Sequence, residues 1–384
     1  MNAEAPLIFL VAGEPSGDAL GGRLMAALKR RTGGNVRFAG VGGEAMAAEG
    51  LESLFPMTEL SIIGVFEVLP HARRIFGRMA ETAAAVDRLK PAAIVTIDAP
   101  AFAHGFVRRI RDRTIPRIHY VAPSVWAWRP WRVHKFQRNF DHLLALLPFE
   151  PPHFEAAGLP CVFVGHPAIE EMNEVTDGAA FRAAHGIDPD ATVLCVLPGS
   201  RRSEVQRLID IFGRTVDGLA DRVGRFHVVV PTLGGVEDLV REAVRAWRVP
   251  VTVVLGRAQR QAAMVASNAA LAASGTVALE LAAAGVPSVI CYRLPLPTYL
   301  VLKFMVRVRY ANLINIILDA PIVPERLQGD CRPDLLCDDL EALLGKAGQE
   351  QVRRLQPALE RLRPDGAKPS ERAADAILRV AEAQ

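Results

Sequence analysis

The stretch LIFLVAGEPSGDALGGRL, residues 7–24, decides how the chain begins to fold. An unbroken apolar run leads into a glycine-containing turn, and leucines then recur every four residues from Leu20. Such a strand, turn and helix open a nucleotide-binding βα unit, in which a phosphate lies on the helix N terminus. Here, however, the turn carries Glu14 and Asp18, whose charges repel a phosphate at that place.

Length and composition limit the class of protein. With 384 residues the chain exceeds the usual size of one hydrophobic core, so two domains are expected. Half of the residues are hydrophobic and 23% are charged, which is a globular composition and excludes general disorder. The net charge of +3 does not by itself indicate nucleic acid. The charge is uneven, because nine Lys or Arg residues between Val107 and Arg138 face a single acid, Asp112.

Cysteine usage and the N terminus bear on the compartment. The five cysteines are scattered without a CxxC pair, which is typical of free thiols in a reducing cytosol. An acid and no basic segment precede the first apolar run, so we expect no signal peptide. There is no uncharged apolar run of about eighteen residues, so we expect no membrane span. Contact with a membrane surface remains open.

Short runs rich in Val, Ile and Leu alternate with helical stretches along the chain. The runs are LIFLVAG, RFAGVGG, AAIVTIDAP, RIHYVAP, LLALLP, CVFVG, TVLCVLPGS, FHVVVPT, VTVVLG, AALAASGT and PSVICY. Strands that are apolar on both faces belong to parallel sheets covered by helices on both sides. The alternation therefore predicts an α/β fold with two Rossmann-like, doubly wound parallel-sheet domains.

A polar, turn-rich stretch at residues 166–191 separates the two groups of strands. We expect an N-terminal domain over residues 1–168 and a second domain over 169–340. Charged amphipathic helices should follow over 341–384 and pack back toward the N-terminal domain. Doubly wound sheets bind ligands beyond the carboxyl ends of their strands, so the expected site is the cleft between the two domains.

Two segments mix large apolar residues with cations. Residues 60–79 contain three arginines, and residues 299–310 contain Lys303, Arg307 and Arg309. Apolar bulk interleaved with cations suits the interface of an anionic bilayer. A buried helix with solvated arginines accounts for either segment taken alone, so the pattern leaves both interpretations open.

Phosphate chemistry reappears in the second half, in LCVLPGSRRSEV, residues 194–205. A strand ends before Gly199 and Ser200, which open a turn, and Arg201 follows where a helix begins. Backbone N–H groups, a hydroxyl and a guanidinium converge there, as a diphosphate requires. An ordinary turn with solvated arginines is the alternative.

A second turn of small residues lies in AASGTVALELAAAGVP, residues 272–287. Ser274, Gly275 and Thr276 follow a strand and start a helix, and Glu280 comes one turn further on. The turn can take a phosphate while the carboxylate accepts the two hydroxyls of a ribose. Thr276 as a cap and Glu280 as a surface residue is the alternative, but the PGSR turn in the same half favours a nucleotide.

The first half offers one candidate base. Asp98, in IVTIDAPAF, ends an apolar strand, where a carboxylate is partly desolvated and points into the ligand cleft. A general base of this kind typically contributes about 100-fold to 10,000-fold in rate. An Asp at a strand end is also a common helix cap or turn former, and the pattern does not separate the two.

Aromatic residues and cations are concentrated in HYVAPSVWAWRPWRVHKF, residues 119–136. Trp126, Trp128 and Trp131 are three of the four tryptophans of the chain, and Arg129 lies among them. Such a segment can stack nucleic-acid bases, bind an anionic sugar or contact a lipid headgroup, and composition does not separate these roles.

Several familiar signals are absent or misplaced. There is no Walker A sequence, and GVGGEA lies in the second βα turn without an acid about twenty residues further on, so a dinucleotide is weakly supported. GEPSG misses the GxSxG elbow by one position, which disfavours an esterase. No His or Cys cluster has metal-ligand spacing. The sequence DPD, residues 188–190, precedes a strand, whereas the metal-holding DxD of a sugar transferase follows one, so DPD indicates a turn. We therefore expect neither a metal ion nor another cofactor.

Six motifs coincide in order and spacing. They are AGEPSGD (12–18), IDAPAF (97–102), HYVAPSVWAW (119–128), LPGSR (197–201), ASGTVALE (273–280) and VPERLQ (323–328). Over essentially the whole chain the sequence resembles the lipid-A-disaccharide synthases, for which APSVWAW is highly specific. The resemblance implies an inverting GT-B glycosyltransferase. It would join UDP-2,3-diacylglucosamine to the 6-hydroxyl of 2,3-diacylglucosamine 1-phosphate, giving a β-1,6 disaccharide and UDP without a metal.

The resemblance also assigns roles to single residues. Asp98 is the base. Since phosphate binding falls to the second half, the acidic turn is free to face the acceptor, where Glu14 and Asp18 accept hydrogen bonds from its hydroxyls or hold the turn beside Asp98. Donor binding falls to Gly199, Ser200, Arg201, Ser274, Gly275, Thr276, Glu280, Asn315, Glu325 and Gln328. The acceptor side comprises Ser16, Asp18, Ser124, Trp126, Trp128 and Arg129. Two positions depart from the family pattern: Ala101 replaces a common acid, and Ile314 replaces a frequent Pro.

The expected partners follow from the same resemblance. They are the two acylated substrates, the anionic lipid of the inner membrane and a second copy of the chain, whereas nucleic acid is not expected. The protein would lie in the cytoplasm, peripherally attached to the inner membrane. The rival hypothesis is a transferase or epimerase that acts on a soluble UDP-sugar.

Overall fold

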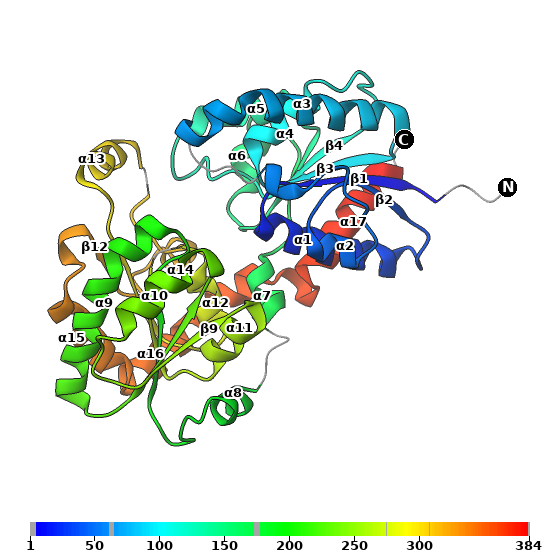
Figure 1. Ribbon diagram of the computed structural model, residues 1–384. Helices are drawn as coiled ribbons and strands as arrows, with labels where there is room; N and C mark the ends of the chain where they lie inside the picture. Colours follow the sequence, from blue (N-terminus) through cyan, green and yellow to red (C-terminus); the bar gives the residue numbers. More distant parts are fainter. Residues whose placement is uncertain (1–4, 61–64, 173–176, 274, 307, 383–384) are drawn as a thin grey trace. The chain divides into compact units, whose positions relative to one another are not determined.

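The computed structural model describes residues 5–60, 65–172, 177–273, 275–306 and 308–382. The chain divides into two compact units, each described by itself (Figure 1). Unit 1 comprises Met1–Pro167 and Leu362–Gln384, and unit 2 comprises Ala168–Arg361. The masked positions include Ser274 and Arg307, so these two predictions lie outside the described residues.

Unit 1 is built on a parallel sheet that has six strands in the described residues, in the order β2-β1-β3-β4-β5-β6. Its strands are β1 (Leu7–Ala12), β2 (Arg37–Val41), β3 (Ala93–Ile97), β4 (Arg117–Tyr120), β5 (His142–Ala145) and β6 (Cys161–Phe163). Its helices are α1 (Pro15–Arg31), α2 (Glu44–Ala48), α3 (Val65–Leu89), α4 (Pro100–Val107), α5 (Val133–Gln137), α6 (Pro151–Glu155) and α17 (Pro369–Glu382). Short 3₁₀ turns are η1 (Met57–Glu59), η2 (Pro130–Arg132) and η5 (Pro364–Gly366). Figure 1 shows α3 and α4 on one face of this sheet and α1 and α17 on the other.

Unit 2 repeats the plan with a parallel sheet that also has six strands in the part of the chain described, in the order β12-β11-β10-β7-β8-β9. Its strands are β7 (Val193–Leu197), β8 (His227–Thr232), β9 (Val251–Leu255), β10 (Ala269–Ala273), β11 (Ser288–Tyr292) and β12 (Glu325–Leu327). Its helices are α7 (Pro167–Met172), α8 (Gly178–Ala184), α9 (Arg202–Val223), α10 (Glu237–Val244), α11 (Arg257–Val265), α12 (Val277–Ala283), α13 (Leu296–Met305), α14 (Leu313–Leu318), α15 (Pro333–Leu343) and α16 (Lys346–Leu362). The 3₁₀ turns are η3 (Gly234–Val236) and η4 (Gln328–Asp330).

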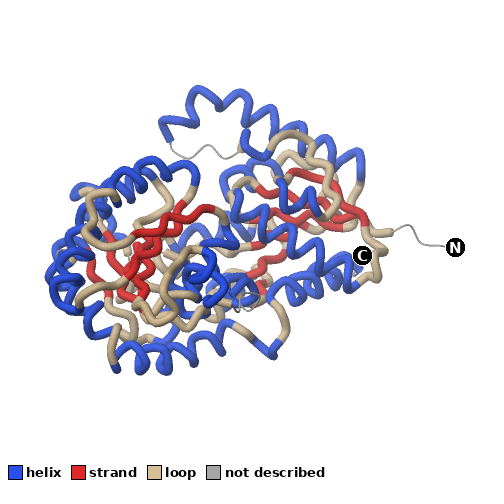
Figure 2. The backbone as a smooth tube through the Cα atoms, turned by 60° about the horizontal axis from the view of Figure 1, so that its bottom comes forward, coloured by secondary structure: helices blue, strands red, loops and turns tan. Residues whose placement is uncertain are grey.

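The strands form because their sequences are apolar on both faces. Every residue of β3, β7 and β10 is buried, and Figure 2 shows the strands of each unit enclosed by helices. Burial on both sides is what a parallel sheet requires, since its crossover helices cover both faces. The predicted α/β fold with two doubly wound sheets is therefore confirmed.

The last helices of the chain divide between the units. In unit 2, the Gln351 side chain on α16 accepts from Ser288 N at 2.7 Å and donates back to Ser288 O. In unit 1, α17 packs on α1, where Arg31 forms an ion pair with Asp375 at 2.9 Å. The buried Ile377 of α17 joins the unit 1 core.

The strand order places the functional edges. In unit 1 the order reverses between β1 and β3, and in unit 2 between β7 and β10. Ligands of doubly wound sheets bind at such switch points, outside the carboxyl ends of the strands. These are the four strands that precede the GEPSG, DAPAF, PGSR and ASGT turns. Among the described residues, no helix combines the length and apolarity needed to cross a bilayer.

Candidate active site

Asp98 follows β3 directly and has a strained backbone. Its φ is 51° and that of Ala99 is 45°, so two consecutive non-glycine residues have left-handed backbone conformations before α4 begins. Such residues cost of order 1–3 kcal/mol each and persist where the surrounding structure holds them, often at active sites. Asp98 N donates to Tyr120 O of the neighbouring strand β4 at 2.9 Å, which helps to hold this turn.

The electrostatics of Asp98 suit a base. Burial raises the pKa of its carboxyl above the ordinary value, and a hydrogen bond from the Ala99 backbone N–H only partly offsets this. Partial desolvation makes a carboxylate more basic, which favours its acceptance of a proton from a hydroxyl.

The glycine-containing turn after β1 lies against this same loop. A Cβ on Gly13 would lie 2.7 Å from the Ala99 Cβ, so only glycine fits where the two turns meet. A Cβ on Gly17 would lie 3.3 Å from Ile97 O, at the end of β3. The β1–β3 pairing thus brings Glu14, the half-buried N-cap of α1, to the edge that carries Asp98. Ser16 is exposed in the first turn of α1.

Asp18 has a structural role within its turn, and its contact with the acceptor stays a prediction. The side chain is 6% exposed. Its carboxylate accepts from Gly43 N at 2.7 Å, Ala45 N at 2.9 Å and Met46 N at 3.1 Å. These amides form the N terminus of α2, so the carboxylate caps that helix from outside. The acidic turn therefore fastens α1 to α2.

The loop after β4 carries the aromatic segment. Trp126 donates from Nε1 to Glu150 Oε1 at 3.1 Å and meets Phe149 edge to face, so it anchors the loop internally. The Arg129 guanidinium lies 4.3 Å from the centre of the half-buried Trp128 ring, a cation–π contact. Ser124 and Arg129 are exposed at the same edge. Of the predicted acceptor-side residues in this loop, Trp126 is thus the one committed to packing.

In unit 2, the PGSR turn is already capped by the chain itself. The carboxylate of Glu204, in the first turn of α9, accepts from Ser200 N at 3.2 Å and Arg201 N at 3.3 Å. Its other oxygen accepts from Arg201 Nη1 at 3.2 Å and from the Tyr292 hydroxyl at 3.0 Å. The backbone N–H groups that were predicted to hold a diphosphate thus donate to this carboxylate, and their contact with a diphosphate stays a prediction. The Arg201 side chain itself is 66% exposed.

The turn after β10 presents Gly275 and Thr276 to solvent. Glu280 follows on α12, with a side chain that is 15% exposed, and pairs with Arg260 of α11 at 2.8 Å. One nitrogen of Arg260 contacts both carboxylate oxygens. The predicted ribose acceptor is thus held by a cation from the preceding βα unit.

Asn315 and Glu325 bond to each other and to the backbone. Buried Asn315 donates from Nδ2 to Val323 O and Glu325 Oε1, both at 2.8 Å. Its Oδ1 accepts from Ile322 N and Val323 N. Glu325 in turn accepts from Ala311 N and Asn312 N, both at 2.9 Å. These bonds hold the 311–325 segment, and the donor contacts of this pair stay a prediction.

Gln328 and two departures from the family pattern complete the predicted set. Gln328 has a φ of 52° and starts the turn after β12, where its carbonyl accepts from Arg293 Nε at 3.3 Å. Ala101 is exposed in the first turn of α4, whereas Ile314 is buried in α14. Within the described ranges, no group of three His, Cys, Asp or Glu side chains is arranged to hold a metal ion.

Comparison with known sequences identifies the family. The family model described as lipid-A-disaccharide synthetase matches residues 8–379. The chain belongs to this family. Among its relatives, the lipid-A-disaccharide synthase of Rhodospirillum centenum is 54% identical over 378 residues, covering 97% of this chain and 94% of the relative. That of Paramagnetospirillum magneticum is 50% identical and covers 97% of both chains.

Solved structures similar to this synthetase family member support the fold alone. The UDP-GlcNAc 2-epimerase of Neisseria meningitidis, solved with UDP-GlcNAc, has a TM-score of 0.65 at 11% identity and covers 98% of this chain and 99% of its own. MurG of Acinetobacter baumannii has a TM-score of 0.60 at 12% identity and covers 97% and 99%. These proteins share the two Rossmann-like domains of GT-B glycosyltransferases with the lipid-A-disaccharide synthetases.

The sequence analysis missed four residues of this chain that organise the candidate site: Glu150, Glu204, Arg260 and Tyr292. Glu204 could have been found, because a Glu three residues after a helix N-cap is the spacing of a capping box. Arg260 and Glu280 are twenty positions apart on different helices, so no local pattern joins them. The same holds for Trp126 and Glu150.

Proposed function

We propose that this protein condenses UDP-2,3-diacylglucosamine with 2,3-diacylglucosamine 1-phosphate to give the β-1,6-linked lipid A disaccharide 1-phosphate and UDP. The proposal rests chiefly on the family match over residues 8–379. It is supported by the carboxylate of Asp98, which lies partly desolvated on a strained turn at the switch point of unit 1.

Asp98 is the general base of the proposed reaction. Its carboxylate takes the proton of the acceptor 6-hydroxyl as that oxygen attacks the anomeric carbon of the donor. The bond from this carbon to the diphosphate oxygen breaks, UDP leaves with the electron pair, and attack from the opposite face inverts the configuration. Glu14, on the adjoining turn, binds or orients the acceptor hydroxyls.

Unit 2 holds the donor in this proposal. The exposed guanidinium of Arg201 and the turn containing Gly275 and Thr276 meet the diphosphate, and Glu280 accepts the ribose hydroxyls. The Arg201 cation and the backbone donors of this turn would stabilise the charge that develops on UDP without a metal ion. Asn315 and Glu325 act indirectly, by holding the loop next to Gln328.

Unit 1 holds the acceptor. Ser16, Ser124, Trp128 and Arg129 are accessible at the carboxyl edge that carries Asp98. Arg129 is a suitable partner for the acceptor 1-phosphate, because the residue is exposed and its backbone lies in a left-handed turn with a φ of 53°.

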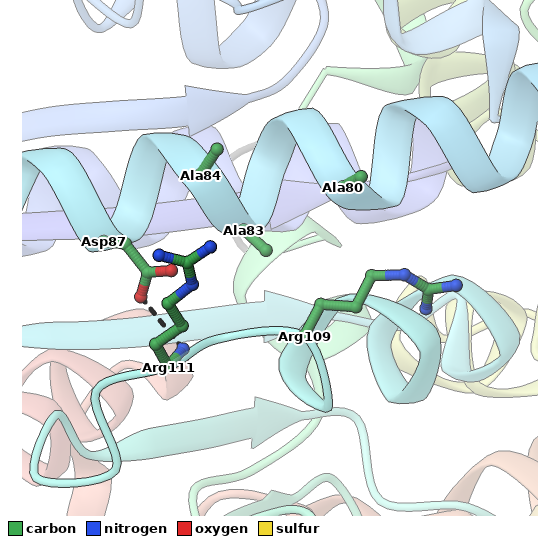
Figure 3. Close-up of a pocket in the computed structure, with 6 residues that line it drawn as sticks. All are labelled: Ala80, Ala83, Ala84, Asp87, Arg109 and Arg111. Atoms are coloured by element: carbon green, nitrogen blue, oxygen red, sulfur yellow. Dashed lines mark hydrogen bonds between the residues drawn. The ribbon is translucent and has the colours of Figure 1, made fainter.

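We further propose that unit 1 attaches the enzyme peripherally to the cytoplasmic face of the inner membrane. On α3, Phe76 is 55% exposed, and the Arg109 guanidinium lies 5.6 Å from its ring centre. A shallow groove of about 370 Å³ follows the same helix (Figure 3). Its lining consists of Ala80, Ala83, Ala84, Asp87, Arg109 and Arg111. An exposed aromatic residue beside cations suits an anionic bilayer surface. A homodimer is part of the same proposal.

The test uses purified protein and both acylated substrates in EDTA. We expect release of UDP and disaccharide. Asp98→Asn should lower turnover by about 100-fold to 10,000-fold, while UDP still raises the melting temperature. Asp210→Asn, at an exposed site on α9, is the matched control and should keep wild-type turnover. Full activity of Asp98→Asn would remove this residue from the role of base.

Two other outcomes would replace the proposal. Turnover of UDP-N-acetylglucosamine without an acylated partner would indicate an enzyme of soluble UDP-sugars. Salt-sensitive binding of RNA or DNA without affinity for UDP would indicate a nucleic-acid-binding protein.

A further inference from the structure

The N terminus of α9 is closed by a buried carboxylate of the chain itself. Glu204 is 8% exposed and makes four contacts, to Ser200 N, Arg201 N, Arg201 Nη1 and the Tyr292 hydroxyl, at 3.0–3.3 Å. Gly199 makes this approach possible, since a Cβ there would lie 2.9 Å from the Glu204 Cβ, and its φ of 123° favours glycine. The carboxylate therefore occupies the position that an anion takes at a helix N terminus.

This closure changes what a diphosphate can contact. A phosphate placed on the same amides would lie next to a buried negative charge, which repels it. Most of the Arg201 guanidinium remains available. Nη1 donates to Glu204, and within the described residues no other hydrogen bond of this side chain is found. Its side chain is 66% exposed. A guanidinium carries five N–H donors, so one bond to Glu204 leaves others for a ligand.

The Glu204 contacts also join two parts of the carboxyl edge of unit 2. Arg201 follows β7, whereas Tyr292 is the last residue of β11. In the sheet, β10 lies between these two strands. The carboxylate thus connects the two sides of the strand that leads into the turn of Gly275 and Thr276.

We propose that Glu204 is the positioning residue of the donor site, fixing the Arg201 guanidinium so that this side chain, and not the turn amides, binds the donor diphosphate. This inference rests on the proposed function, because it concerns the same UDP-sugar. Glu204 itself does not touch the substrate. It acts by restricting a long, flexible side chain to one geometry before the diphosphate arrives, which reduces the entropy lost on binding.

The experiment compares the binding of UDP and of uridine by titration calorimetry. Because Arg201 meets phosphate and not the nucleoside, Glu204→Ala should weaken UDP about tenfold and leave uridine unchanged. The double variant Glu204→Ala/Arg201→Ala should bind UDP as weakly as Arg201→Ala alone, because the two substitutions remove the same interaction with the diphosphate. The donor KM should rise more than kcat falls.

The matched control is Glu242→Ala, which removes the acid of an exposed Glu–Arg pair with the same spacing on α10. This variant should bind UDP and uridine as the wild type does. If Glu204→Ala does not fold, Glu204→Gln, which keeps one acceptor oxygen, is measured in the same way. An equal loss for UDP and uridine, or an additive loss with Arg201→Ala, would overturn the inference. Absence of UDP binding by the wild type would instead remove the proposed function.

Discussion

A buried carboxyl group in unit 1 should make the stability of the protein depend on pH. Glu150, which is 3% exposed, accepts from Trp126 Nε1 at 3.1 Å, from Leu146 N at 3.2 Å and from Leu147 N at 3.0 Å. Burial raises the pKa of this carboxyl to about 7, and the three hydrogen bonds offset only part of that effect. Glu150→Gln removes the titration while keeping a side chain of nearly the same shape.

The sign and size follow from proton linkage. The ordinary pKa is 4.5, so between pH 4.5 and about 7 the folded protein binds more protons than the unfolded chain. The free energy of unfolding therefore falls as pH rises through this window. From pH 5 to pH 8 the loss in the wild type should exceed that in Glu150→Gln by about 2.5 kcal/mol, since one pKa unit corresponds to about 1.4 kcal/mol.

The assay is urea unfolding at pH 5, 6, 7 and 8, followed by tryptophan fluorescence. Trp126, Trp128 and Trp131 lie in unit 1, so the signal reports mainly on the unit that contains Glu150. Glu155→Gln, at an exposed position on α6, is the control and should follow the wild type at every pH. A difference between wild type and Glu150→Gln that stays constant within about 1 kcal/mol from pH 5 to pH 8 would refute the reasoning.

Three further predictions test other parts of the molecule. Gly13→Ala places a Cβ 2.7 Å from the Ala99 Cβ, so this variant should destabilise unit 1 by about 1–3 kcal/mol and lower turnover. In the control Gly77→Ala the new Cβ meets nothing within 4 Å, so stability and turnover should not change. Thermal unfolding measures the stability and UDP release measures the turnover. Asn315→Ala leaves its four hydrogen bonds unmade and should cost about 3 kcal/mol in urea unfolding, with a higher donor KM. His104, whose ring nitrogens have no hydrogen-bond partner in the described part of the chain, has its pKa lowered to about 4 by burial. As pH falls below 6.5, the unfolded chain therefore takes up a proton before the folded protein does, which destabilises the wild type. The free energy of unfolding of His104→Phe should gain about 2 kcal/mol over that of the wild type at pH 5 but not at pH 8.

Several residues predicted to contact the substrates also form a polar scaffold behind the site. Asp18, Asn315 and Glu325 were each assigned to substrate binding from the sequence, and each proves to be a buried or half-buried acceptor of backbone N–H groups. Leaving such amides unpaired costs about as much as losing a ligand contact. A motif residue can therefore serve the site by holding its loops, and its type alone does not separate this role from direct binding.

The apolar runs by themselves determined the fold. Each predicted run forms a strand, because continuous Val, Ile and Leu favour a sheet buried on both faces, and the turns after β1, β3, β7 and β10 follow from where those runs end. Strand β12 was not predicted as a strand, since its three residues, Glu325–Leu327, include two charged side chains at a sheet edge.

Only the tertiary structure decided which polar group meets which. Residues far apart in the chain meet in three places: α17 packs on α1, Arg260 pairs with Glu280, and Trp126 donates a hydrogen bond to Glu150. Charged and amide side chains have several partners of similar energy, and packing, not local sequence, selects among them. The GEPSGD turn illustrates both points. The end of the apolar run places the turn, whereas the close approach of Gly13 to the Ala99 loop and the bonds from Asp18 to α2 appear only in the folded unit.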